Sequence, residues 1–163
     1  MRRLKKLLHL HSISFLAVAE PFIFPNKQPE IMSQLGFNFM AANVNDKLWI
    51  FSRGTLQFSV IQSTTQLLHL SCLPGDGMSL WMVTFIYAKG TRRERMELWA
   101  DLAKITASTQ GAPWFLGGDF NCVVSMDEYQ GGGCPDLSSM EDFRQCISDC
   151  DLMEVPYTGS KFT

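Results

Sequence analysis

Asp119 and Asn121 are the residues of this chain whose types and spacing best suit chemistry. They end the apolar, glycine-closed stretch Pro113-Trp114-Phe115-Leu116-Gly117-Gly118-Asp119-Phe120-Asn121. If this stretch is a buried strand that ends in a loop, the alternation of side chains places Asp119 and Asn121 on one side of an extended segment. A carboxylate and a carboxamide at a strand end suit a site that handles phosphate or a metal. The same residue types also shape tight turns, so the stretch alone leaves both interpretations open.

Gly117 and Gly118 precede this pair of polar residues. Glycine removes side-chain bulk where the backbone must turn or where another group approaches closely. We therefore expect one of these two conditions at the end of the predicted strand.

Five further strands are predicted upstream, because apolar runs alternate there with turn residues. They are Phe37–Ala42, Lys47–Phe51, Leu56–Gln62, Leu67–Cys72 and Leu80–Tyr87. Their spacing of about ten residues favours an antiparallel meander. The last one is apolar on both faces, so it is expected to be a central strand that ends at Tyr87.

Helices are predicted where apolar residues recur every three or four positions. The candidates are an N-terminal helix around Leu4–Leu8, a short helix from Pro29 to Gln34, a helix from Arg92 to about Ala107 capped by Thr91, and a helix behind a capping box at Ser138–Glu141. The apolar face of the third is expected to hold Met96, Trp99, Leu102, Ala103 and either Ile105 or Thr106. Short strands are expected at Ile13–Ala19 and Leu152–Val155. This order of elements predicts an α/β (α+β) sandwich in layers.

Composition describes a globular chain without a global basic field. The 163 residues suggest one domain, and the net charge is −2. The five cysteines have no zinc-site spacing and favour a reducing compartment. Cys146 and Cys150 would share one face of a helix, and His69, between two leucines, is expected to be structural.

The N-terminus has a basic start, an apolar run and a small-x-small motif at Ala17–Ala19, as a secretory signal has. His9, His11, Ser12 and Ser14 interrupt the apolar run, which favours an intracellular protein, either nuclear or cytoplasmic. No run approaches the length of a membrane span. Secretion with cleavage after Ala19 stays as an alternative.

Several motifs, taken in this order, resemble the endonuclease domain of plant LINE-type (non-LTR) retrotransposons, within the endonuclease/exonuclease/phosphatase superfamily that includes DNase I. The resemblance runs from about Leu7 to Thr163. Its motifs are Phe15-Leu16-Ala17-Val18-Ala19-Glu20-Pro21, Leu35-Gly36-Phe37, Phe85-Ile86-Tyr87-Ala88, Arg95 with Leu98-Trp99, Pro113-Trp114, Gly117-Gly118-Asp119-Phe120-Asn121, Glu128 with Gly131-Gly132, Met140 with Phe143, and Gly159 with Phe162-Thr163.

The resemblance implies part of a four-layer α-β-β-α sandwich and cleavage of DNA phosphodiesters with Mg²⁺ or Mn²⁺. Glu20 would bind the metal, and Tyr87 would contact the scissile phosphate. Asp119 would activate water or protonate the leaving oxygen, while Asn121 would donate to the phosphoryl oxygens. Thr163 falls on a position that contacts the phosphate region. No membrane or protein partner is implied.

The sequence departs from this family at both ends. Neither the family's Asn-bearing first strand nor its closing Asp-His segment is present, so residues 1–163 are expected to form a single incomplete domain of a truncated retrotransposon-derived frame. Because residues that act as a unit fail together, we expect little or no nuclease activity. The alternatives are an active minimal phosphodiesterase and a non-catalytic remnant that binds weakly.

Overall fold

The computed structural model describes residues 2–54, 57–73, 79–109, 111–130, 133 and 136–156. The chain divides into two compact units. Unit 1 comprises Met1–Tyr87 and Gly111–Gly118, and unit 2 comprises Ala88–Gln110 and Asp119–Thr163.

The first sheet of unit 1 has three antiparallel strands in the order β1-β3-β2. They are β1 (Phe15–Ala19), β2 (Phe39–Ala42) and β3 (Leu48–Ser52). Every residue of β3 is buried, as expected for a central strand covered on both faces.

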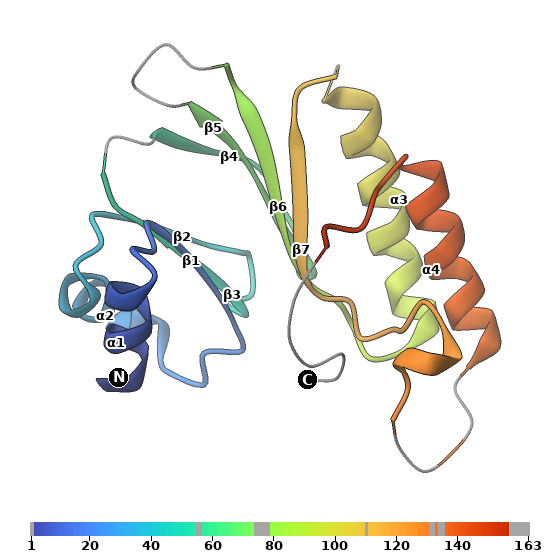
Figure 1. Cartoon of the computed structure of the whole chain (residues 1–163), viewed down its shortest axis with the longest axis horizontal. Coiled ribbons are helices and arrows are strands. Elements are labelled where there is room, and N and C mark those ends of the chain that lie inside the picture. Colours follow the sequence, from blue (N-terminus) through green and yellow to red (C-terminus); the bar gives the residue numbers. More distant parts are fainter. Residues whose placement is uncertain are drawn as a thin grey trace. The chain divides into compact units, whose positions relative to one another are not determined.

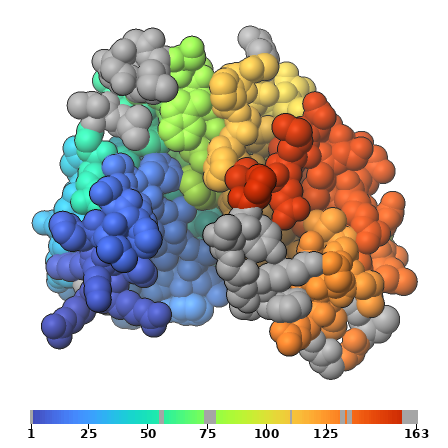
Figure 2. Space-filling model, viewed as in Figure 1, coloured from blue at the N-terminus to red at the C-terminus, as the bar shows by residue number. Residues whose placement is uncertain are grey.

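Two helices cover one face of this sheet (Figure 1). They are α1 (Arg2–Leu10) and α2 (Gln28–Leu35), the latter preceded by the short 3₁₀ helix η1 (Pro25–Lys27). Leu8 of α1 and Leu35 of α2 pack in one cluster with Trp49 and Phe51 of β3. The outer side of α1 is at the surface, shown in dark blue in Figure 2, and carries exposed basic residues.

The second sheet of unit 1 has the order β4-β5-β6-β7. Its strands are β4 (Gln57–Ser63), β5 (Leu67–Leu73), β6 (Trp81–Tyr87) and β7 (Trp114–Asp119). The first three are antiparallel. β6 and β7 are parallel, because their hydrogen bonds advance together: Met82 N–H donates to Pro113 O and Ala88 N–H donates to Asp119 O, each at 2.8 Å. The predicted central position of β6 is thus confirmed.

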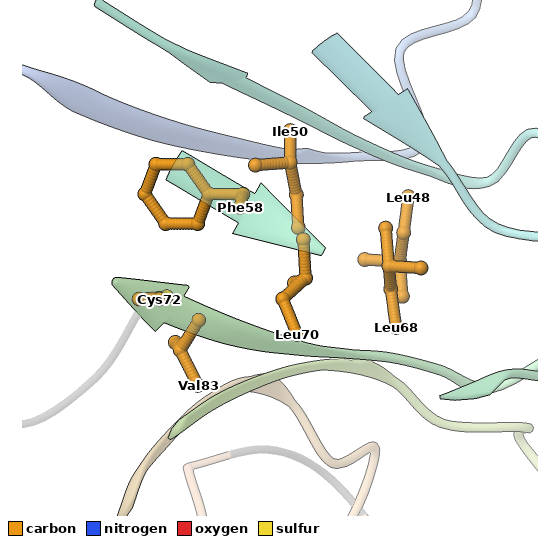
Figure 3. Packing of buried hydrophobic residues seen from close by; sticks show 7 residues of the cluster. All are labelled: Leu48, Ile50, Phe58, Leu68, Leu70, Cys72 and Val83. Carbon is orange, nitrogen blue, oxygen red and sulfur yellow. The ribbon is translucent and has the colours of Figure 1, made fainter. Parts of the chain in front are cut away.

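The core of unit 1 lies between the two sheets (Figure 3). β3 contributes Leu48 and Ile50, and the second sheet contributes Phe58, Leu68, Leu70, Cys72 and Val83. Because alternate side chains of a strand point to opposite faces, Leu48 and Ile50 face this core while Trp49 and Phe51 face the helices. Full burial of one such side chain contributes about 1.5–3 kcal/mol.

Unit 2 is built on α3 (Arg92–Ser108) and α4 (Leu137–Asp149), with the short helix η2 (Met126–Glu128) between them in sequence. Its core includes aromatic rings in contact: Phe143 stacks on Trp99 with centroids 5.2 Å apart and lies tilted against Phe120, with centroids 4.7 Å apart. Cys146 and Cys150 are both buried, which confirms their shared helical face.

Two details of these helices differ from prediction. The buried face of α3 consists of Arg95, Leu98, Trp99, Leu102 and Ile105. Met96 is 49% exposed and Ala103 is exposed, so the apolar face was placed wrongly at these two positions. The capping box was also wrong: Asp136 caps α4 and accepts from the backbone N–H groups of Ser138 and Ser139.

The two sheets and their helices confirm the predicted α+β class. The single meander was wrong, because β3 and β4 belong to different sheets. Residues 152–155 form no strand. Within the described ranges, no helix is long and apolar enough to cross a bilayer.

Candidate active site

Glu20 lies directly after β1, as predicted for a strand-end carboxylate. Its backbone N–H donates to Lys47 O at 2.8 Å, which continues the pairing of β1 with the segment before β3. Its carboxylate Oε1 lies 3.5 Å from Lys47 Nζ, and the Glu20 side chain is 33% exposed. Its φ of +46° is unusual for a residue other than glycine. The carboxylate is therefore accessible to solvent but already faces one cation.

Tyr87 is the last residue of β6, also as predicted. Its N–H donates to Gln66 O at 2.9 Å, which fixes the backbone at this strand end. The half-buried side chain packs against the core cluster between the two sheets. The tyrosine body is thus held by apolar contacts.

Gly118 permits close contact between β7 and β6. A Cβ built on Gly118 would lie 2.0 Å from Ile86 O and 2.7 Å from Ile86 N, and its φ is +143°. No L side chain fits in that space or favours that backbone conformation. The close approach expected from the sequence is therefore present at Gly118, whereas a Cβ on Gly117 would make only an ordinary 3.6 Å contact with Phe115 Cε1.

Asp119 and Asn121 form a tight turn at the end of β7. Asn121 N–H donates to Asp119 Oδ1 at 2.9 Å, and Asn121 has a left-handed φ of +47°. The prediction that both residues lie on one side of an extended segment was wrong, because the chain leaves the strand at Asp119. Asparagine tolerates this conformation better than most residues, since its short polar side chain can bond locally.

The Asn121 side chain also holds the residue that follows β6. Its Nδ2 donates to Ala88 O at 2.6 Å, and Ala88 N–H in turn donates to Asp119 O at 2.8 Å. These bonds connect the turn after β7 to the first residue beyond β6. The Asn121 amide therefore has a structural partner within the turn.

A buried guanidinium supports the same segment. Arg95 is 5% exposed, and its Nη1 donates to Lys89 O at 2.9 Å and to Gly90 O at 2.8 Å. Its Nη2 donates to Ser139 Oγ. Arg95 thus fixes the backbone that follows Ala88.

The predicted site residues fall into two local groups. Glu20 and Tyr87 belong to unit 1, whereas Asp119 and Asn121 share one turn in unit 2. Thr163 lies outside the described residues. No sequence motif pointed to Lys47, because its contact with Glu20 depends on the register between β1 and β3.

The donor chemistry of these residues fits a hard divalent cation. Glu20 and Asp119 offer carboxylate oxygens, which Mg²⁺ and Mn²⁺ prefer over nitrogen or sulfur. In the described part of the chain, no three His, Cys, Asp or Glu side chains gather as a preformed metal centre. A cation at Glu20 would compete with the Lys47 ammonium for the carboxylate.

His69 has a structural role, as the sequence suggested. Its Nδ1 lies 2.8 Å from Thr84 Oγ1, which also accepts from Trp114 Nε1 at 2.8 Å. Burial lowers the pKa of His69 below its usual 6.5, and a backbone hydrogen bond with Val83 has a smaller opposite effect. The Thr84 hydroxyl thus links His69 of β5 and Trp114 of β7 to β6.

Comparison with solved structures decides the fold. The endonuclease domain of TRAS1, a telomere-specific non-LTR retrotransposon, matches over 91% of this chain and 64% of its own, with a TM-score of 0.62 and 11% identity. This chain has the DNase I-like fold. The superfamily resemblance inferred from the sequence is thereby confirmed at the level of the fold.

Two other proteins share the DNase I-like fold with this chain. The human Nocturnin catalytic domain matches over 77% of this chain and 58% of its own, with a TM-score of 0.54 and 15% identity. Truncated Caenorhabditis elegans TDP2 matches over 83% of this chain and 58% of its own, with a TM-score of 0.53 and 17% identity. The chain therefore spans about three fifths of the length of these proteins. No family model and no curated protein matches it.

Proposed function

We propose that this chain is a metal-dependent phosphodiesterase-type domain that acts on DNA, with little or no cleavage by the chain alone. The observation that carries the proposal is that Glu20, Tyr87 and Asp119 each lie at a strand end in a DNase I-like fold. Ends of strands are where this class of layered fold can present polar groups beyond a rigid core.

In this proposal each residue has a distinct task. Glu20 would hold Mg²⁺ or Mn²⁺, which would supply positive charge to neutralise the phosphate. Asp119 activates water or protonates the leaving oxygen. Asn121 and Tyr87 hydrogen-bond phosphoryl oxygens, and Thr163 contacts the phosphate region.

Two contacts support a low activity. The Lys47 ammonium lies 3.5 Å from the Glu20 carboxylate, so a metal must displace it. One N–H of Asn121 Nδ2 already donates to Ala88 O at 2.6 Å, so only the second N–H remains for a phosphate oxygen while this turn is intact. Both contacts engage groups that a preorganised site would keep free for the metal and the phosphate.

Metal binding tests the proposal directly. Electron paramagnetic resonance of added Mn²⁺ should show a bound ion that Glu20→Gln releases. Glu30→Gln is the matched control, because Glu30 is an exposed carboxylate that also pairs with a lysine, Lys27, at 3.0 Å. Equal Mn²⁺ binding by wild type and Glu20→Gln would remove Glu20 from the site.

Plasmid nicking with Mg²⁺ tests catalysis separately. We expect slow nicking or none, and any nicking should disappear in Asp119→Ala. Fast nicking that Asp119→Ala abolishes would contradict the low activity and support the active alternative. Absence of both nicking and Mn²⁺ binding at Glu20 would instead support the non-catalytic binding module.

A further inference from the structure

Segment 21–24, directly after Glu20, exposes two phenylalanine rings to solvent. Phe22 is 85% exposed and Phe24 is 81% exposed, and Ile23 between them is 45% exposed. Side chains of this size and polarity are usually buried, and scattered single exceptions need no explanation. Three consecutive apolar side chains on one short segment are a different case, because they expose a continuous apolar surface.

This aromatic segment is connected to the proposed metal ligand through Lys47. The Lys47 Nζ lies 5.7 Å from the centroid of the Phe22 ring and 3.5 Å from Glu20 Oε1. One cation therefore contacts both a π face and the carboxylate, and a cation over a ring face is an attractive arrangement.

The backbone of the aromatic segment is held in an unusual conformation. Glu20 and Phe22 have left-handed φ values of +46° and +48°, which non-glycine residues seldom adopt. Phe24 is extended, with φ −60° and ψ 136°, and Pro25 begins η1 immediately after it. Strained residues of this kind cluster at functional sites, and here one of them, Phe22, carries an exposed ring.

The charge of unit 1 favours a polyanionic ligand. Its basic residues are Arg2, Arg3, Lys5, Lys6, Lys27, Lys47 and Arg53, and its acidic residues are Glu20, Glu30, Asp46 and Asp76. Unit 1 is therefore net positive although the whole chain carries −2. Positive charge together with exposed aromatic side chains is the combination that binds single-stranded nucleic acid.

We propose that Phe22 and Phe24 stack against unpaired bases of a single-stranded nucleic acid beside Glu20. This inference rests on the proposed function, because it assigns that site a substrate with unpaired nucleotides. Stacking on a phenyl ring is tolerant of sequence, since every base has a π face. The surface would thus favour unpaired over paired bases without selecting a sequence.

The test separates base stacking from attraction to the phosphate backbone. Fluorescence anisotropy would measure the Kd of the full chain for a labelled oligothymidine and for the same oligonucleotide with abasic sites at its centre, both in EDTA. We expect wild type to bind the intact oligonucleotide about tenfold more tightly. The double variant Phe22→Ala/Phe24→Ala should bind both oligonucleotides equally.

Phe115→Ala is the matched control, because Phe115 lies on β7 of the same unit and is 50% exposed. It should keep the wild-type preference for bases. A preference that survives in Phe22→Ala/Phe24→Ala, or no binding by wild type, would overturn the inference. The inference would also be overturned if sedimentation velocity showed that wild type is a homodimer and that the only effect of the double variant is to dissociate it.

EDTA makes the failure of this inference distinguishable from that of the proposed function. Base-dependent binding without Mn²⁺ binding or nicking would retain the stacking surface and reject the metal site. Mn²⁺ binding that depends on Glu20, with no change of oligonucleotide affinity in the double variant, would retain the metal site and reject the stacking surface.

Discussion

Gly118 allows Asp119 to follow a strand that lies unusually close to its neighbour. The backbone of Ile86 occupies the space that any side chain at position 118 would need. Asp119 then begins the turn in which Asn121 N–H donates to its Oδ1. At the scale of single residues, the site therefore depends on a missing Cβ as much as on the polar groups.

Gly118→Ala should destabilise the protein strongly, by about 3 kcal/mol or more, because the new Cβ would meet backbone atoms that cannot move aside. Urea unfolding followed by circular dichroism would measure the change. Gly117→Ala is the control, since its Cβ would meet only Phe115 Cε1 at 3.6 Å. Similar losses in both variants would show that close strand contact is not the cause.

At the scale of elements, helix ends are fixed by side chains close in sequence. Thr91 caps α3 by accepting from Glu94 N–H at 3.3 Å, as its position predicted. For α4 the prediction placed the capping box at Ser138–Glu141, whereas the residue that caps the helix is Asp136. Asp136 has the extended backbone of an N-cap residue, with φ −72° and ψ 100°.

Asp136→Ala should lower the free energy of unfolding by about 1 kcal/mol, because the N–H groups of Ser138 and Ser139 lose their acceptor. Ser138→Ala should change it by only a few tenths of that amount, since Ser138 is exposed within the first turn. Chemical denaturation of both variants would compare them. A larger loss of unfolding free energy for Ser138→Ala than for Asp136→Ala would support the capping box predicted from the sequence.

A second feature of this kind connects three strands through the buried Thr84 hydroxyl and the His69 imidazole. Thr84 Oγ1 is shared by His69 of β5 and Trp114 of β7, both at 2.8 Å. Burial disfavours the charged imidazolium, so the pKa of His69 is lower in the folded protein than in the unfolded chain.

The sign of the pH dependence follows from this lowered pKa. The unfolded chain binds the proton more readily, so the contribution of His69 to stability is complete above pH 6.5 and falls as the pH drops toward the pKa of the folded state. Urea midpoints between pH 5 and 7.5 should therefore decrease on acidification, and His69→Gln should flatten this trend. His9→Gln is the control because His9 is exposed on α1. Arg92 lowers the pKa of Asp142 below 3.8, so that carboxylate titrates outside this window.

Across the whole molecule, the sequence predicted the position of individual strands better than the pairing of strands into sheets. Leu80–Tyr87 was placed correctly as a central strand because it is apolar on both faces. The membership of β3 and β4 in different sheets could not be predicted, since it depends on contacts between distant segments. Glu20 was selected through family resemblance, whereas its contact with Lys47 required the register between β1 and β3.

The distribution of buried thiols gives a prediction for both units. Cys72 in unit 1 is 0% exposed, and Cys146 and Cys150 in unit 2 are 5% and 3% exposed. Burial raises the pKa of Cys72 to about 12, and burial together with Cys150 raises that of Cys146 to about 12. Because the thiolate is the reactive form, these groups should react very slowly at neutral pH.

Alkylation with iodoacetamide at pH 7.5, followed by mass spectrometry of peptides, would measure each thiol separately. We expect Cys72 and Cys146 to label at least a hundredfold more slowly in the native protein than in concentrated urea, because modification requires their unit to open. Half-buried Cys122, whose Sγ lies 3.3 Å from Ser139 O, is the internal comparison and should label faster than either. Rapid native labelling of Cys72 would contradict the packing between the sheets of unit 1, and rapid labelling of Cys146 would contradict that of α4 in unit 2.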